Sequence, residues 1–248
     1  MAYTFLVLLG CLLTNNEAYR YGMGFIVEYK NQLFVVSCKH VFETLPNKNS
    51  IFIIPNPRQS ISQKFSINLG EVYFHPDDNK DFTFDIAVYK LLEYDKSTLL
   101  SKGIIPLKIQ NNYKSKYNNT TKLFSAGFPA KYTDIYFAKN NGNIIPPKIV
   151  EGNLFTPAVD KTYIVGKETG EGYKEKRYIR TKNGERLGEG VSGGLVFIKD
   201  ESNSIYPIGL LSGEGDYEIN FPNGTKEKLY CLVYIKIERV IEVLDNIH

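Results

Sequence analysis

The chain has 248 residues, of which 43% are hydrophobic and 23% are charged. A chain of this length and composition can bury a full core, which excludes a disordered protein, a fibre and a repeat array. The formal net charge is only +3, and lysines and arginines alternate with glutamates. This pattern lacks the basic footprint of a nucleic-acid-binding protein, so no nucleic-acid partner is expected.

The first apolar run, residues 5–13, lies close to the N-terminus. No Lys or Arg precedes it, no clear small-residue cleavage site follows it, and it is too short to span a membrane. We therefore expect a first β-strand rather than a signal peptide, and no membrane partner. This strand leads through a turn at 14–17 into further runs at 21–27 and 33–36, which predicts a meander.

Two apolar runs carry the residues of a possible catalytic pair. The run 33–41 is rich in β-branched and aromatic residues, and we expect it to form a buried strand that delivers His40 at its end. The run 85–91 begins with Asp85, its charge at the head of an apolar strand. An imidazole N–H could satisfy such a buried carboxylate.

A glycine-rich turn, residues 190–194, contains Ser192. A serine in such a turn can act as a nucleophile if a histidine accepts its proton. An α/β-hydrolase elbow has the same Gly-x-Ser-x-Gly pattern, but it needs a histidine downstream, and the only candidate there is the terminal His248. The chain order His40, Asp85, Ser192 therefore favours a different catalytic fold.

Short apolar runs separated by Asn, Asp, Gly and Pro clusters predict an all-β fold with one amphipathic helix, at 238–244. In the first half the expected strands are near 3–13, 21–29, 32–38, 51–54, 64–74 and 84–91. In the second half they are at 122–126, 148–155, 162–165, 177–181, 195–198, 206–212 and 229–237. The expected domains are 1–105 and 123–248, joined by a linker at 106–122.

These motifs together resemble the trypsin-like, chymotrypsin-fold serine proteases. The resemblance rests on Cys38-Lys39-His40-Val41, on His75-Pro76 ahead of Asp85-Ile86-Ala87-Val88, and on Gly190-Val191-Ser192-Gly193-Gly194, and it continues through 126–129 and 207–213 to the final helix. It implies two six-stranded antiparallel β-barrels with a short C-terminal α-helix. His40 and Asp85 would belong to the first barrel and Ser192 to the second.

The resemblance also implies roles for individual residues. Ser192 would be the nucleophile, His40 the general base, and Asp85 the group that orients the imidazole. The backbone N–H groups of Gly190 and Ser192 would form the oxyanion hole. No metal or organic cofactor is required. His75 would lie on a surface loop without a catalytic role, and His248 would have none either.

The substrate pocket would lie between residues 184–189 and 212–215. Arg186 falls near the pocket base and Glu214 on the facing wall, so they could select charged side chains, or pair and close the pocket. The backbone of Ser212, Gly213 and Glu214 would pair with an extended substrate.

Two departures from the secreted members of the family affect the interpretation. Val191 replaces the acidic residue that usually pairs with a new N-terminus after zymogen cleavage, so the turn must be ordered in another way. The odd cysteine count, Cys11, Cys38 and Cys231, leaves at least one thiol free. We expect the cysteines to be packing residues in a reducing, cytoplasmic compartment, as in intracellular and bacterial branches of the family.

The expected function is a serine endopeptidase directed at a protein or peptide substrate, with a possible regulatory protein partner. The alternative is a binding module that keeps the protease fold without turnover.

Overall fold

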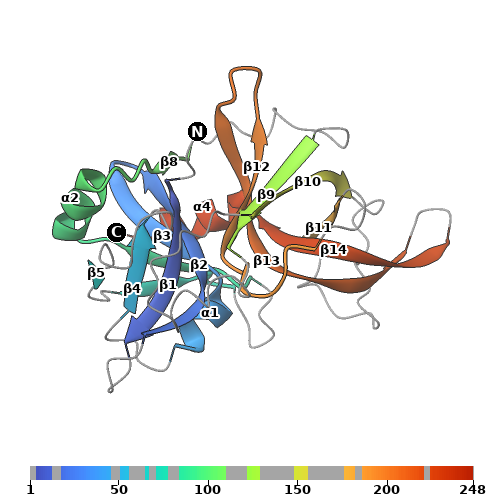
Figure 1. Cartoon of the computed structure of the whole chain (residues 1–248), viewed down its shortest axis with the longest axis horizontal. Helices are drawn as coiled ribbons and strands as arrows, with labels where there is room; N and C mark the ends of the chain where they lie inside the picture. Colours follow the sequence, from blue (N-terminus) through green and yellow to red (C-terminus); the bar gives the residue numbers. More distant parts are fainter. Residues whose placement is uncertain are drawn as a thin grey trace.

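The computed structural model describes most of the chain as two β-rich halves followed by a short C-terminal helix (Figure 1). The described residues are 4–12, 18–45, 51–55, 65–66, 71–77, 84–109, 122–128, 148–155, 176–181, 186–220 and 224–247. The expectation of a mostly β protein with a C-terminal helix is confirmed. The turn at 14–17, the strand expected at 162–165 and His248 lie outside the described residues.

The first half forms one sheet with the strand order β5-β4-β1-β2-β3-β7-β6, and β8 pairs with β2 in parallel. The strands are β1 (Leu6–Leu12), β2 (Ala18–Tyr29), β3 (Gln32–Ser37), β4 (Ile51–Pro55), β5 (Phe65–Ser66), β6 (Val72–Phe74), β7 (Ala87–Lys90) and β8 (Leu107–Lys108). Among the described strands β5 and β6 end the sheet at opposite edges, so closure into a barrel is not confirmed. The run expected as one strand at 64–74 contributes both of these short edge strands.

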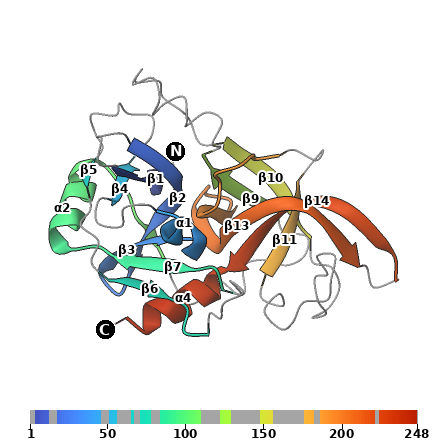
Figure 2. The same ribbon diagram turned by 90° about the horizontal axis from the view of Figure 1, so that it is seen from below.

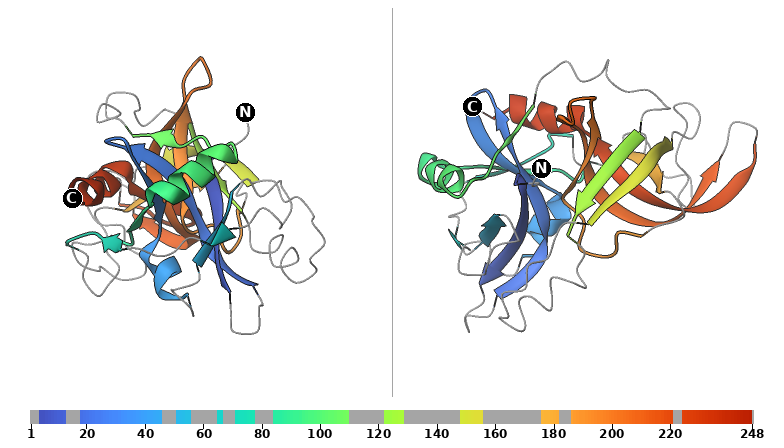
Figure 3. Two further views of the ribbon diagram at one scale, coloured as in Figure 1. Left: turned by 90° about the vertical axis from the view of Figure 1, so that its left-hand side faces the viewer. Right: turned by 45° about the horizontal axis from the view of Figure 1, so that its top comes forward.

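The second half closes on itself in the order β10-β11-β14-β13-β12-β9. Its strands are β9 (Lys122–Gly127), β10 (Lys148–Phe155), β11 (Lys176–Thr181), β12 (Gly194–Lys199), β13 (Ile205–Asn220) and β14 (Lys226–Lys236). β13 and β14 are longer than predicted, and their hairpin projects beyond the rest of the barrel (Figures 1 and 3). The serine turn lies immediately before β12.

The N-terminal apolar run forms β1, as predicted. β1 lies between β2 and β4 and pairs with both. The neighbouring strands satisfy the backbone groups at both of its edges, and its side chains pack in the core, where Leu6 through Leu9 are buried. The three cysteines are also buried and form no disulfide, which agrees with the expected packing role.

Two short helices were not predicted. β3 ends at Ser37, and His40 lies in helix α1 (Lys39–Glu43) rather than at the end of a strand, so the predicted strand through Val41 is wrong in its last residues. Helix α2 (Glu93–Ser101) carries no continuous apolar stripe, which explains why periodicity missed it. Among the described helices, none has the length and apolar character needed to cross a membrane.

The predicted C-terminal helix is confirmed as α4 (Ile237–Asp245). It follows the barrel in the chain but lies beside β6 and β7 of the first sheet (Figure 2). Its apolar face joins the core of the first half through Ile237, Val240, Val243 and Leu244. At its end Asp245 accepts hydrogen bonds from Tyr29 Oη at 2.7 Å and Lys30 Nζ at 2.8 Å. The last helix therefore fastens the second half to the first.

His75 is buried, with 3% of its surface exposed, so the predicted position on a surface loop is wrong. Its Nε2 lies 2.9 Å from Glu242 Oε2 on α4, and its ring stacks on Phe84 with a centroid distance of 4.0 Å. The Asp77 N–H donates to Nδ1 at 3.2 Å, which places the ring hydrogen of the neutral imidazole on Nε2. This histidine supports the segment that leads to Asp85.

Candidate active site

His40 and Asp85 meet because β3 and β7 pair antiparallel, with Ser37 opposite Ala87. Continuing this register by two residues brings Asp85 beside the start of α1. His40 Nδ1 lies 2.7 Å from Asp85 Oδ2, and the His40 backbone N–H donates to Asp85 Oδ1 at 3.0 Å. The carboxylate thus fixes both the backbone and the ring of the histidine.

Burial differs between the two partners. The side chain of Asp85 is 4% exposed, whereas that of His40 is 39% exposed. A carboxylate accepts hydrogen bonds, so Nδ1 carries the ring hydrogen and Nε2 is the acceptor nitrogen. The imidazole can therefore take a proton at Nε2 while the buried carboxylate stabilises the cation.

Ser212 provides a further hydrogen bond to the carboxylate. Its Oγ donates to Asp85 Oδ2 at 3.0 Å. With the two bonds from His40, Asp85 accepts three hydrogen bonds, which compensates for burying its charge. The sequence analysis assigned only the Ser212 backbone to substrate binding. Nothing local in the sequence marks this hydroxyl, because its partner lies in the other half of the chain.

Ser192 lies at the contact between the two halves. Its carbonyl accepts a hydrogen bond from the Met23 N–H at 3.2 Å. A Cβ built at Gly22 would lie 3.3 Å from the Ser192 carbonyl oxygen and 2.8 Å from both methyl groups of Val41. Ser192 and Val41, the residue after His40, therefore both approach Gly22, which has no room for a side chain.

The Ser192 hydroxyl donates to the Ser212 carbonyl at 3.2 Å. Among the described residues, it makes no hydrogen bond to the His40 ring. The predicted triad residues are nonetheless joined through Ser212, whose hydroxyl contacts Asp85 and whose carbonyl contacts Ser192. All three lie in one site formed by both halves of the molecule.

The serine turn is held by backbone hydrogen bonds and by close packing. Gly193 N–H donates to Leu211 O at 2.8 Å and Gly194 N–H to Val191 O at 2.9 Å. Gly193 has φ +91°, and a Cβ there would lie 1.8 Å from Met23 O. Only glycine fits this position, because the left-handed backbone and the touching carbonyl both exclude a side chain.

Val191 shows how the turn is ordered without an acidic residue. It is 1% exposed and packs in an apolar cluster that includes Leu187 and Leu211. Gly190, immediately before it, has φ +81°. The N–H groups predicted for the oxyanion hole, those of Gly190 and Ser192, therefore flank a residue anchored in the barrel core. Among the described residues, the Ser192 N–H has no acceptor within the protein.

The predicted pocket residues are linked to one another. Both carboxylate oxygens of Glu214 lie 3.0 Å from the Gly188 N–H, and Tyr230 Oη donates a short hydrogen bond to the same carboxylate. Burial first, and then the hydrogen bond to Glu214, raise the pKa of Tyr230 well above its usual value. Tyr230 is a site residue that the sequence analysis missed.

Arg186 lies on the outer side of this group. Its guanidinium is 4.6 Å from the centroid of the Tyr230 ring and 3.4 Å from Asp216 Oδ1, and its side chain is 64% exposed. Gly213, by contrast, is open, because a Cβ there would meet nothing within 4 Å. Beyond Leu211, the edge of β13 that faces away from β14 has no described partner strand, so a chain could lie along it.

One group of side chains has the composition of a metal site. The ligand atoms of Cys38, His40 and Asp85 lie within 4.8 Å of one another. All three already make hydrogen bonds, since Cys38 Sγ donates to Leu211 O at 3.3 Å and Asp85 holds His40 and Ser212. A cation would have to replace these hydrogen bonds.

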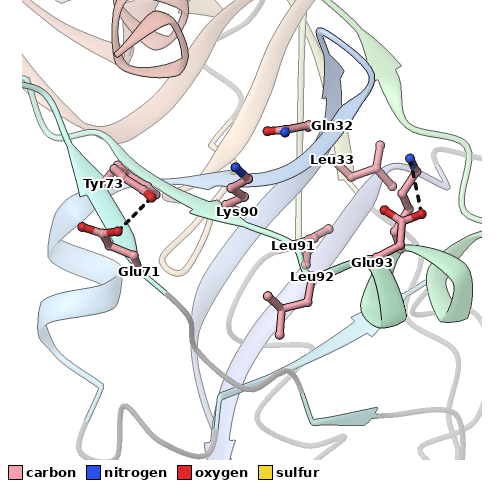
Figure 4. A pocket seen from close by; sticks show the side chains of 9 residues that line it. Gln32, Leu33, Glu71, Tyr73, Lys90, Leu91, Leu92 and Glu93 are labelled. Atoms are coloured by element: carbon pink, nitrogen blue, oxygen red, sulfur yellow. Dashed lines mark hydrogen bonds and ion pairs between the residues drawn. The ribbon is translucent and has the colours of Figure 1, made fainter. Parts of the chain in front are cut away.

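A separate cavity of about 360 Å³ lies in the first half (Figure 4). It is lined by Gln32, Leu33, Glu71, Tyr73, Lys90, Leu91, Leu92, Glu93 and Lys96. Two internal contacts, Tyr73 Oη to Glu71 at 2.9 Å and Lys96 Nζ to Glu93 at 3.8 Å, occupy much of its polar lining. None of the predicted site residues contributes to it.

Comparison with known proteins adds no assignment. No protein-family model matches the chain, and no curated protein matches it.

Proposed function

We propose that this protein is a trypsin-like serine endopeptidase that hydrolyses peptide bonds through His40, Asp85 and Ser192. One observation carries the proposal: a buried aspartate binds both the backbone N–H and Nδ1 of a half-exposed histidine, and Ser212 links the same aspartate to a serine in a glycine turn. This tautomer leaves Nε2 as the proton acceptor, which is what a serine nucleophile requires.

Catalysis would proceed by acyl transfer. Ser192 Oγ attacks the substrate carbonyl carbon while His40 Nε2 takes the hydroxyl proton, and Asp85 stabilises the imidazolium. The N–H groups of Gly190 and Ser192 donate to the carbonyl oxygen as it becomes negative. His40 then gives the proton to the leaving amine, which breaks the C–N bond. Water, deprotonated by the same imidazole, hydrolyses the acyl-enzyme and restores Ser192.

The reaction requires Ser192 Oγ to leave the Ser212 carbonyl. A change of the χ1 rotamer moves the hydroxyl without moving the backbone, which is held by Met23 and Leu211. Catalytic hydrogen bonds are often long or misaligned before a substrate binds, so the present position of the hydroxyl is compatible with catalysis. A substrate carbonyl in the oxyanion hole would favour the reactive rotamer.

A second candidate is a binding module with the same fold and no turnover. The hydrogen bond from Ser192 to Ser212 favours it, because an unactivated serine would rest in this way. The first candidate better explains why a buried carboxylate accepts three hydrogen bonds from His40 and Ser212.

The same proposal includes a protein or peptide substrate and a regulatory protein partner. It also includes a cytoplasmic location and the complete two-barrel plan. The barrel of the second half and the low cysteine count support it.

Fluorophosphonate labelling tests the proposal. Wild-type protein and the variants Ser192→Ala and Ser202→Ala are treated with the probe, and the modified peptide is identified by mass spectrometry. Ser202 is an exposed serine hydrogen-bonded to Asp200, so it is a matched control. We expect labelling at Ser192 in the wild type and in Ser202→Ala, and none in Ser192→Ala. No labelling of the wild type would favour the binding module.

A further inference from the structure

Glu214 crosses the space in which the proposed function places the substrate side chain. One wall of that space is the segment 186–189 and the other is β13 from Ser212 onward. The Glu214 side chain starts on β13, and its carboxylate accepts the Gly188 N–H at 3.0 Å on both oxygens. The two walls are thus joined by a charged hydrogen bond at the pocket.

Tyr230 on β14 is the second donor to the Glu214 carboxylate. In the β13–β14 register Glu214 lies opposite Leu232, and Asp216 lies opposite Tyr230. Tyr230 is therefore the diagonal neighbour of Glu214, within reach of a long side chain. Its hydroxyl donates to Glu214 Oε2. The carboxylate is fixed by two donors on different segments.

Arg186 and Glu214, the two charged residues expected to contact the substrate side chain, are already engaged within the protein. Arg186 lies over the outer face of the Tyr230 ring and pairs with Asp216. Glu214 is committed to Gly188 and Tyr230. A charged substrate side chain would have to displace these partners before it could bind, whereas a small uncharged side chain would leave them intact.

We propose that Glu214 closes the specificity pocket, so that the enzyme cleaves after small residues such as Gly, Ala and Ser. This inference rests on the proposed protease function. A larger side chain must break the Glu214 bonds to Gly188 and Tyr230 and leave partly buried polar groups without partners, which costs free energy that a small side chain does not. The edge of β13 beyond Leu211, where β12 no longer pairs with it, still lets the substrate backbone pair along β13.

The test is a peptide library that varies only the residue before the scissile bond. For the wild type we expect kcat/KM to be at least about tenfold higher for Gly, Ala and Ser than for Phe, Leu, Lys, Arg or Glu. Glu214→Ala should open the pocket to larger side chains. In this variant, kcat/KM for peptides with Phe or Leu before the scissile bond should rise by about tenfold relative to kcat/KM for the peptide with Ala at that position. Glu214→Gln retains an acceptor for Gly188 and should keep the small-residue preference.

Glu218→Ala is the matched control, since Glu218 lies on the same strand and pairs at the surface with Lys226 at 3.2 Å. It should show the wild-type profile. A wild type that prefers Lys, Arg or a bulky residue overturns the inference, as does a Glu214→Ala variant with an unchanged profile.

Fluorophosphonate labelling of the same preparations separates the two proposals. Labelled protein with the wrong preference contradicts only the role of Glu214. Unlabelled, inactive protein contradicts the protease function and the inference that depends on it.

Discussion

Ser212 donates its hydroxyl hydrogen to Asp85 at 3.0 Å across 127 positions of sequence. The same residue accepts the Ser192 hydroxyl on its carbonyl. Ser212 belongs to β13 of the barrel and Asp85 lies two residues before β7 of the first sheet, so this bond joins the two halves beside the candidate residues His40 and Ser192.

Removing this hydroxyl should weaken the positioning of Asp85. We expect Ser212→Ala to lower kcat by about tenfold, because a hydrogen bond that orients the carboxylate is lost. Ser212→Thr retains the hydroxyl and should recover most of the activity. Steady-state kinetics on a small-residue peptide measures both. Equal activity of the Ala variant and the wild type would show that the bond has no positioning role.

Asp85 should be indispensable for turnover, although not for folding. Asp85→Asn replaces an acceptor with an amide that no longer favours Nδ1–H, and we expect kcat to fall by roughly 10⁴-fold. Asp95→Asn is the matched control, because Asp95 is also buried but lies on α2 and touches no predicted site residue. Its kcat should stay within about twofold of the wild type. Equal losses in both variants would argue against a catalytic Asp85.

Asp95 should make stability depend on pH. Burial raises the pKa of this carboxyl, against a weaker opposing effect of its hydrogen bond with the Leu92 backbone. Between the unfolded and folded pKa values the native state binds more protons, so stability falls as pH rises through the folded pKa. Urea titration across pH should therefore find Asp95→Asn more stable than the wild type at pH 7, with the difference shrinking in acid. A constant difference would contradict this assignment.

Gly193 should tolerate no side chain. Gly193→Ala brings a Cβ to within 1.8 Å of Met23 O on a backbone with φ +91°, and we expect it to cost at least about 2 kcal/mol of stability. Gly213→Ala adds the same methyl group in open space and should change stability by about 0.5 kcal/mol or less. Urea midpoints of the two variants provide the comparison. Similar midpoints would mean that the turn can move away from Met23.

Glu242 should stabilise the contact between α4 and the first half in its ionised form. Burial opposes ionisation, but hydrogen bonds from Arg239 and His75 outweigh it and lower the pKa of Glu242. A lowered pKa gives stability that is present above the unfolded pKa and is lost as pH falls through the folded pKa. Glu242→Gln should cost about 0.5–1 kcal/mol at pH 7, since Glu242 is partly exposed.

The cost of Glu242→Gln should begin to shrink as pH falls past the ordinary Glu pKa of about 4.3, and it should disappear only below the lowered folded pKa of Glu242. Glu227→Gln, at an exposed position of β14, should have little effect at any pH. Denaturation at several pH values measures both variants. If Glu242→Gln still lowers the stability in acid, the loss comes from altered side-chain packing and not from removal of the Glu242 charge.

Local patterns in the sequence were sufficient for much of the fold. Continuous apolar runs mark β1, β3 and β12, and the apolar face of α4 is equally plain, so these elements could be predicted. Helix α1 was missed because it is a single short turn after β3, and α2 because few of its residues are buried. Residue type and chain order also identified His40, Asp85 and Ser192 as candidates, since catalysis by serine needs those groups.

Only the tertiary structure decided how the candidates meet. Three contacts join residues far apart in the chain. Ser212 donates its hydroxyl to Asp85, Glu214 binds Gly188 and Tyr230, and the buried His75 binds Glu242. Such contacts depend on strand register and on the packing of the two halves. A hydrogen bond needs its partners within about 3 Å, and local sequence patterns carry no information about that distance.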